Sequence, residues 1–342
     1  MKKLRITLLP FAILLLACKE VPQKEISQPE TKEFHFSIEI LDDEALNLLD
    51  PEAELKVLAG GFQWTEGPLW ISSGNYLLFS EIPGNKVYKW DAVNDTTVYL
   101  QPSGYSGAGY YSKEPGANGL LLNPQGELVL MQHGDRRIVK MNAPLDAPST
   151  NFITLVDNYQ GKKLNSPNDG VFDREGNLYF TDPPYGLPAG MADPSKELDF
   201  QGVYFLRTNG ELILLDKLSR PNGIVLSTDE KTLYVAVSDE SHAVWYTYDI
   251  EDPGQVANKH LFYDVTHLIG KEGEQGLPDG MVMHSRNYLF ATGPGGVWVF
   301  TEKAKAIARI HTGLATSNCT FSADEHTLYI TADDFLLSVD VL

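Results

Sequence analysis

Short apolar runs separated by turn residues dominate the hydrophobic pattern of this chain. Runs rich in Val, Ile, Leu, Tyr and Phe are bounded by Gly, Pro, Asn and Asp, and few segments show the helical period. This pattern is typical of an all-β fold built from many short strands. One strand recurs along the chain, at 74–81 (GNYLLFSE), 126–133 (GELVLMQH), 176–183 (GNLYFTDP), 231–238 (KTLYVAVS), 286–293 (RNYLFATG) and 326–333 (HTLYITAD).

The spacing of this repeated strand indicates the architecture. The equivalent positions in successive copies lie 51, 50, 55, 55 and 40 residues apart and are Leu77, Leu128, Leu178, Leu233, Tyr288 and Leu328. An all-β repeat of about 40–55 residues is the signature of a β-propeller, in which each repeat forms one blade. We therefore predict a six-bladed β-propeller with a central metal site over residues 35–342, since a β-sandwich would require six coincidental similarities. Residues 54–60 and 336–342 are expected to share the last blade.

A polar residue precedes the repeated strand by about ten positions in every copy. Because the repeat fixes the phase of these residues, they should occupy equivalent places on the innermost strands, which face the channel of a propeller. A turn role is the alternative for each Asn taken singly. The predicted ring consists of Glu66, Asn118, Asn168, Asn222, Asp279 and Asn318.

Two carboxylates in this ring favour a bound cation. Glu66 and Asp279 would converge with no basic side chain near them in sequence, and such like charges are costly unless a cation lies between them. Carboxylate and amide oxygens form a hard donor set that suits Ca²⁺, with Mg²⁺, Mn²⁺ or Zn²⁺ as substitutes. No His/Cys cluster with the spacing of a zinc site is present.

The far ends of the repeated strands should return to the face of the ring, because adjacent strands of a blade are antiparallel. His133 is the member of this second tier whose side chain ordinarily titrates near neutral pH, so it is a candidate base; an exposed loop histidine is the alternative. Arg136 and Arg137 are candidates for orienting a polar ligand, with a solvated blade turn as the alternative for at least one of them. Loops 105–117 and 183–200 could form walls that stack on sugars or pack an apolar ligand, or could be inert connections. The second tier comprises Glu81, His133, Asp182, Ser238, Thr292 and Asp333.

The N-terminus, MKKLRITLLPFAILLLAC, has a basic head and an apolar run too short to span a bilayer. Its end resembles a bacterial lipobox, so we predict a signal peptide over 1–17, lipidation of Cys18 and a polar tether over 18–34. A plain secretory signal is the alternative. The expected location is the bacterial cell envelope, facing the periplasm or associated with the outer membrane, with membrane contact only through the lipid.

Charge and cysteine content exclude two further possibilities. The net charge of −19 disfavours nucleic-acid binding, because the protein would repel phosphates. Only Cys319 follows Cys18, so no disulfide is expected within the folded domain, and a small buried side chain is expected at Cys319.

Several blocks of the chain resemble the SMP-30/gluconolactonase/luciferin-regenerating-enzyme-like family, over roughly residues 58–334. These blocks are TEGPLW, GANGLLLNPQGELVLMQHGDRRIVKM, NSPNDGVFDREGNLYFTDPPYG, RPNGIVLSTDEKTLYVAVSD and LPDGMV. The resemblance implies a six-bladed propeller with one catalytic divalent metal, commonly Ca²⁺. It also implies hydrolysis of sugar lactones or, in relatives, of other esters and organophosphates. The metal ligands that it implies are Glu66, Asn168, Asn222 and Asp279, with Asp279 also a proposed base.

The expected activity is the opening of a sugar lactone, such as glucono-1,5-lactone to gluconate, with Asp279, or His133 through a water, removing the proton. Ser166 stands where animal members of the family carry a substrate-binding Arg, which weakens the sugar assignment. A broader lactonase or phosphotriesterase, or a non-catalytic ligand-binding lipoprotein, is the alternative. No G-x-S-x-G motif indicates a serine nucleophile. The candidate substrate contacts are Asn118, Asp182, Tyr185, Asn318 and Arg136.

Overall fold

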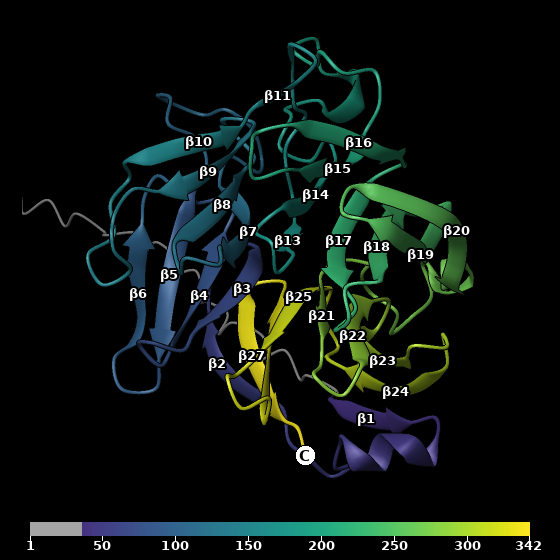
Figure 1. The fold of residues 1–342 in the computed structure, drawn as a ribbon. Coiled ribbons are helices and arrows are strands. Elements are labelled where there is room, and N and C mark those ends of the chain that lie inside the picture. Colours follow the sequence, from purple (N-terminus) through teal and green to yellow (C-terminus); the bar gives the residue numbers. More distant parts are fainter. Residues whose placement is uncertain (1–35) are drawn as a thin grey trace, which may run out of the picture. The chain divides into compact units, whose positions relative to one another are not determined.

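Six antiparallel sheets, five with four strands and one with five, surround a central axis in the computed structural model, which describes residues 36–342 (Figure 1). The predicted six-bladed, all-β propeller is confirmed. Within the described residues the helices are three short 3-10 segments, η1 (Asp43–Asn47), η2 (Gly190–Ala192) and η3 (Thr266–Leu268). The predicted signal peptide, Cys18 and the tether lie outside the described residues. No helix in the described part is long and apolar enough to cross a membrane.

The first three blades follow one another along the chain. Each blade runs from its innermost to its outermost strand in sequence order. The first contains β3 (Thr65–Ile71), β4 (Tyr76–Glu81), β5 (Lys86–Asp91) and β6 (Asp95–Leu100). The second contains β7 (Ala117–Leu122), β8 (Leu128–Gln132), β9 (Arg137–Met141) and β10 (Phe152–Val156). The third contains β13 (Gly170–Phe172), β14 (Leu178–Asp182), β15 (Gly202–Leu206) and β16 (Leu212–Lys217), and a small hairpin precedes it, β11 (Asn158–Tyr159) with β12 (Lys162–Lys163).

The last three blades continue the pattern, and two of them recruit strands from the N-terminal part of the described chain. The fourth contains β17 (Pro221–Leu226), β18 (Thr232–Asp239), β19 (His242–Asp252) and β20 (Gln255–Asp264). The fifth contains β21 (Met281–Met283), β22 (Tyr288–Gly293), β23 (Gly296–Thr301), β24 (Ala306–His311) and, outermost, β1 (Ser37–Ile40). The sixth contains β25 (Thr316–Phe321), β26 (Thr327–Ala332), β27 (Phe335–Asp340) and, outermost, β2 (Lys56–Gly60).

The ring is closed by β2, which pairs with the C-terminal strand β27 in the register Lys56↔Ser338 (Figure 1). The expected sharing of the last blade by residues 54–60 and 336–342 is therefore confirmed. The addition of β1 to the fifth blade is a feature that the sequence did not predict. Leu48 and Leu49, just after η1, are fully buried against residues of the fifth and sixth blades.

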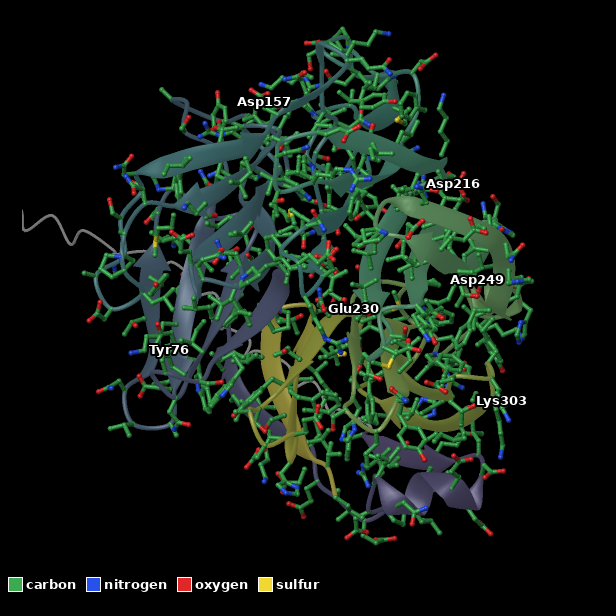
Figure 2. The ribbon with its side chains drawn as sticks, viewed as in Figure 1. Tyr76, Asp157, Asp216, Glu230, Asp249 and Lys303 are labelled. Carbon is green, nitrogen blue, oxygen red and sulfur yellow. The ribbon has the colours of Figure 1, made fainter. Side chains whose placement is uncertain are left out.

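The core lies between the blades, so the second strand of each blade is buried on both faces. All six residues of β4 and all five of β14 are buried. These second strands are the repeated segments of the sequence, which explains why they read as continuous apolar runs rather than as alternating ones. Charged side chains lie toward the outside of the propeller, among them Asp216, Asp249 and Lys303 (Figure 2).

Candidate functional site

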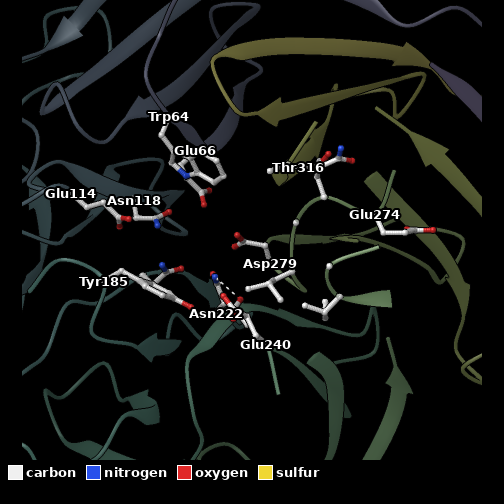
Figure 3. A pocket seen from close by; sticks show the side chains of 18 of the residues that line it. Trp64, Glu66, Glu114, Asn118, Tyr185, Asn222, Glu240, Glu274, Asp279 and Thr316 are labelled. Carbon is white, nitrogen blue, oxygen red and sulfur yellow. Dashed lines mark hydrogen bonds between the residues drawn. The ribbon is translucent and has the colours of Figure 1, made fainter. Parts of the chain in front are cut away.

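The predicted ring residues lie at the inner edge of the blades, at or just ahead of each first strand. Glu66 lies on β3, Asn118 on β7 and Asn222 on β17. Asn168 and Asp279 each stand two residues ahead of an inner strand, β13 and β21. These five residues line one cavity of about 620 Å³, and Figure 3 shows Glu66, Asn118, Asn222 and Asp279 converging in it. The structure therefore brings together the four residues that the family resemblance implies as metal ligands.

The sixth ring residue lies below this cavity. Asn318 lines a smaller hollow of about 150 Å³ in the channel, together with Asp169. Its side chain hydrogen-bonds with the carboxylates of Glu66 and Asp169, and its Oδ1 accepts from the N–H of Cys319. Asn318 is thus a neighbour of Glu66 that does not line the larger cavity.

Glycines next to the ring residues allow neighbouring blades to approach closely. A Cβ on Gly67 would lie 2.3 Å from the carbonyl oxygen of Asn118, and one on Gly223 would lie 2.1 Å from that of Asp279. Gly67 also has a φ of 50°, a left-handed conformation that glycine adopts without strain. The Glu-Gly and Asn-Gly pairs of the sequence therefore reflect backbone-to-backbone packing around the axis.

Hydroxyl groups at the ends of the second strands fasten the ring from one blade to the next. Ser80 Oγ donates to the carbonyl oxygen of Asn118 at 2.7 Å, and Thr181 Oγ1 donates to that of Asn222 at 2.7 Å. Thr292 Oγ1 donates to the carbonyl oxygen of Ser317 at 2.9 Å. Sequence reasoning missed this role, although a Ser or Thr recurs near the end of the repeated strand.

The cavity concentrates negative charge. Burial raises the pKa of Glu66 to about 8, and the nearby charge of Asp169 adds to the shift. Desolvation, followed by the charges of Glu66 and Asp169, raises the pKa of Asp279 well above its ordinary value. Lys271 is the one basic side chain among the described residues that line the cavity. No basic side chain is among the main causes of either pKa shift, so a bound cation would offset the repulsion between the two carboxylates.

Side-chain oxygen atoms that lack hydrogen-bond partners also favour a cation in this cavity. Asp279 Oδ1 and Asn118 Oδ1 are shielded from solvent and make no hydrogen bond. The Nδ2 group of Asn222 donates a hydrogen bond to Ser238 Oγ at 2.9 Å. The Oδ1 atom of Asn222 therefore remains available to coordinate a cation. Within residues 36–342 no group of three or more His, Cys, Asp and Glu side chains is placed to hold a metal. The ring instead combines two carboxylates with amides, a donor set that fits a hard cation such as Ca²⁺.

The predicted second tier does not surround this cavity. Of its six members only Ser238 lines the cavity wall. Asp182 is fully buried and accepts the N–H groups of Asn165 and Ser166, each at 2.8 Å, while burial raises its pKa to about 7. Arg136 donates its Nε to the carbonyl oxygen of Leu164 at 2.7 Å. Asp182 and Arg136 thus brace the loop that carries Asn168, and neither lines the cavity.

His133 is fully buried, so its interpretation as an exposed loop histidine is wrong. Its Nδ1 lies 3.4 Å from Glu114 Oε2, and neither ring nitrogen makes a hydrogen bond. His133 does not line the cavity, whereas Glu114 does, with its side chain 34% exposed. Sequence reasoning missed Glu114, although it falls in loop 105–117, which was expected to form a wall.

The remaining walls come from three segments. Tyr185 lines the cavity, as predicted for loop 183–200, and Trp64 stands beside Glu66. The connection before β21 contributes Ile269 and Leu277, which sequence reasoning did not identify. The cavity therefore has an apolar and aromatic wall above an oxygen-rich floor, a common design of small-molecule sites.

The chain is similar to known proteins over most of its length. The profile of the SMP-30/Gluconolactonase/LRE-like region matches residues 64–334. The gluconolactonase of Zymomonas mobilis is 37% identical over 298 residues, covering 85% of this chain and 82% of that protein. The structure of a gluconolactonase from Xanthomonas campestris aligns with a TM-score of 0.76 at 29% identity, covering 90% of this chain and 95% of that one. The fold is also shared with a calcium-binding regucalcin from Agrobacterium tumefaciens, with a TM-score of 0.65 at 15% identity over 84% of this chain and 95% of that one. The chain belongs to the SMP-30/gluconolactonase/LRE-like family.

Proposed function

We propose that the protein is a metal-dependent lactonase that opens sugar lactones, with glucono-1,5-lactone to gluconate as the reference reaction. The observation that carries this proposal is the convergence of Glu66, Asn168, Asn222 and Asp279 in one cavity with an aromatic wall. The similarity to gluconolactonases over most of the chain supports the same substrate class.

Glu66, Asn168, Asn222 and Asp279 would hold the cation, for which Ca²⁺ suits the oxygen donors best. When bound, a divalent cation supplies the positive charge that polarises an ester carbonyl and stabilises the oxyanion formed on attack by water. The side chains of the chain keep these donors in place: Ser238 holds the amide of Asn222, and Asn318 holds the carboxylate of Glu66.

Glu114 is the group that we assign to proton transfer. A carboxylate that binds a dication is a weak base, which argues against Asp279. Glu114 lines the cavity outside the proposed ligand set, and His133 behind it can stabilise its carboxylate or share its proton. Glu114 would accept a proton from the attacking water as the new C–O bond forms. It would return that proton to the ring oxygen as the ester C–O bond breaks, so the carboxylate is regenerated.

The experiment is acid release from glucono-1,5-lactone by the purified protein, first treated with EDTA and then supplied with Ca²⁺, Mg²⁺, Mn²⁺ or Zn²⁺. We expect turnover that EDTA abolishes and Ca²⁺ restores. Asp279→Asn should lose turnover, and Asp324→Asn, an exposed carboxylate far from the cavity lining, should retain it. Metal-dependent hydrolysis of a phosphotriester but of no lactone would favour the phosphotriesterase alternative. No turnover of any ester would leave a ligand-binding propeller.

We also propose that the protein is a lipoprotein of the bacterial cell envelope, anchored through Cys18. The basic head, the apolar run and the small residue before the cysteine support this location. Expression with a labelled fatty acid should label the wild type but not Cys18→Ser. Equal labelling of the two forms would refute the anchor.

A further inference from the structure

A second cavity, of about 590 Å³, lies beside the one that contains the ring residues. It is formed by Gln63 ahead of β3, by the turn between β4 and β5, and by the connection from β6 to β7. Each of these segments adjoins the start of an inner strand or the end of the antiparallel strand next to it. Both cavities are therefore on the face of the propeller where the ring residues enter.

A single layer of chain separates the two cavities. Trp64 and Glu114 line the first cavity, and Figure 3 shows them along one side of it. Their immediate neighbours Gln63, Lys113 and Pro115 line the second. Gln63 and Trp64 are consecutive in the chain, as are Lys113, Glu114 and Pro115, so the same two segments serve as walls for both cavities. A ligand longer than one ring could extend from the first cavity over this wall into the second.

The aromatic surface of the second cavity is held in place before any ligand binds. Asn85 Oδ1 accepts the N–H groups of Gly104 at 2.7 Å and Tyr105 at 3.1 Å, and its Nδ2 donates to the carbonyl oxygen of Tyr105 at 2.8 Å. The ring of Tyr105 stacks on that of Tyr111, with centroids 4.7 Å apart and planes inclined by 21°. Tyr110, next to this pair, is 83% exposed. A preformed aromatic surface of this kind costs little entropy on binding.

The lining chemistry favours a neutral, flat, hydroxylated ligand. Three tyrosines and two prolines offer apolar faces, Gln63 offers a polar edge, and Lys113 is the one charged side chain among the described residues that line the cavity. Aromatic rings with a polar tip suit the C–H faces and hydroxyl groups of a pyranose. We propose that this cavity is a glycosyl subsite, so that the substrate class is a disaccharide lactone. Its lactone ring would occupy the first cavity and its second sugar the tyrosine-lined one. This inference rests on the proposed lactonase function.

The test compares kcat/KM for cellobiono-1,5-lactone and for glucono-1,5-lactone in the Ca²⁺-loaded protein. We expect the disaccharide lactone to be preferred by at least about tenfold, equivalent to about 1.4 kcal/mol. Tyr110→Ala should reduce this preference toward unity and leave kcat on glucono-1,5-lactone unchanged, because Tyr110 does not line the first cavity. Val93→Ala, an exposed apolar truncation in the turn between β5 and β6, is the matched control and should keep the preference.

A preference of one or less in the wild type, or one that Tyr110→Ala leaves intact, would overturn the glycosyl subsite. A stronger preference for δ-dodecalactone would assign the cavity to acyl chains instead and would also overturn it. Failure of the proposed function gives a different result, namely no turnover of either sugar lactone. In that case, the glycosyl subsite can still be tested by titration of cellobiose into the protein. Binding that Tyr110→Ala abolishes would support the subsite, and absence of binding would refute it.

Discussion

At the scale of single residues, the site depends on carboxylates that the fold brings together at an energetic cost. Glu66 is buried and Asp279 is half-buried. Desolvation raises the pKa of both; the charge of Asp169 adds to each shift, and the charge of Glu66 adds to that of Asp279. A bound dication removes this repulsion. Metal binding and folding stability should therefore be linked through the protonation of these groups.

Calcium should stabilise the protein more as the pH rises. The pKa of Glu66 in the metal-free fold is about 8 against 4.5 for an ordinary glutamate, so ionisation disfavours the metal-free fold increasingly between these values. The Tm of EDTA-treated protein is expected to fall as the pH rises from 4.5 to about 8, and the gain in Tm from millimolar Ca²⁺ to grow over the same window. Thermal melts with and without Ca²⁺ measure both effects. A Tm gain independent of pH would contradict this linkage, and Glu66→Gln should flatten the metal-free curve.

Replacement of Glu114 tests its role in proton transfer. Glu114→Gln removes the proposed base, so kcat should fall by about 10²–10⁴-fold, while the affinity for Ca²⁺ stays unchanged because Glu114 is outside the ligand set. Added formate should partly restore kcat in Glu114→Ala, an effect that a structural role would not produce.

The matched control for this experiment is Glu240→Gln, which neutralises another carboxylate in the cavity wall and should change kcat little. His133 Nδ1 lies 3.4 Å from Glu114 Oε2, so His133→Gln should lower kcat by altering the position of that carboxylate. An unaltered kcat in Glu114→Gln would return the role of base to Asp279.

At the scale of elements, the position of the ring is determined by contacts from one blade to the next. Two of the inner strands, β13 and β21, have only three residues each, so their own hydrogen-bond ladders give limited support to Asn168 and Asp279. Hydroxyl groups such as that of Thr181, and close glycine contacts such as that of Gly223, connect each ring residue to the neighbouring blade. Substitutions in the second strands should therefore displace the proposed metal ligands even though they replace none of them.

Thr181→Val tests this coupling with little change in shape. It leaves the buried carbonyl of Asn222 without its hydroxyl donor, so we expect a loss of about 1–3 kcal/mol in the free energy of unfolding. The affinity for Ca²⁺ should also fall, because Asn222 is one of its proposed ligands. Thr97→Val, on the outermost strand β6 and exposed, is the control and should alter neither quantity. Unfolding by denaturant and calorimetric titration give the two values; an unchanged Ca²⁺ affinity would show that the blades do not position the ligand.

At the scale of the whole molecule, the cavity exists because the ring of blades is closed by chain from both ends of the domain. The pairing of β2 with β27 places residues 56–60 beside residues 335–338 and completes the sixth blade. Without β2, the edge of β27 would be exposed and the sixth blade would lose its outermost strand. The ring residues on β25 and β3 meet across this closure.

Removal of the closing strand should therefore disturb the site from a distance. A chain that begins at residue 62 is expected to lose cooperative unfolding and Ca²⁺-dependent turnover, because β1, η1 and β2 are all absent. Lys56→Ala removes only the exposed ion pair with Asp340 and should leave the Tm nearly unchanged. Differential scanning calorimetry distinguishes these outcomes. A truncated chain that melts as cooperatively as the full one would show that the closing strand is dispensable.

The sequence by itself determined the number of blades, the phase of the ring and the identity of the closing strands. The reason is that the repeated second strand is buried on both faces, so its composition is constrained in every blade and its period can be read directly. The ring followed from the same period, since residues such as Asn118 and Asn222 precede equivalent positions of the repeated strand by nearly the same number of residues. Residues 54–60 and 336–342 could be assigned to the last blade because a closed ring needs both ends.

Only the tertiary structure decided what each loop side chain does. Asp182 and Arg136 have the chemistry of ligand contacts, but they bond to the backbone of the loop that carries Asn168. His133 is buried behind Glu114, and β1 joins a blade far from it in sequence. These outcomes depend on contacts between loops that are not part of the sequence repeat. They also depend on the direction in which each side chain points at the end of its strand. A period along the chain carries no information about either, because loops between blades differ in length and conformation.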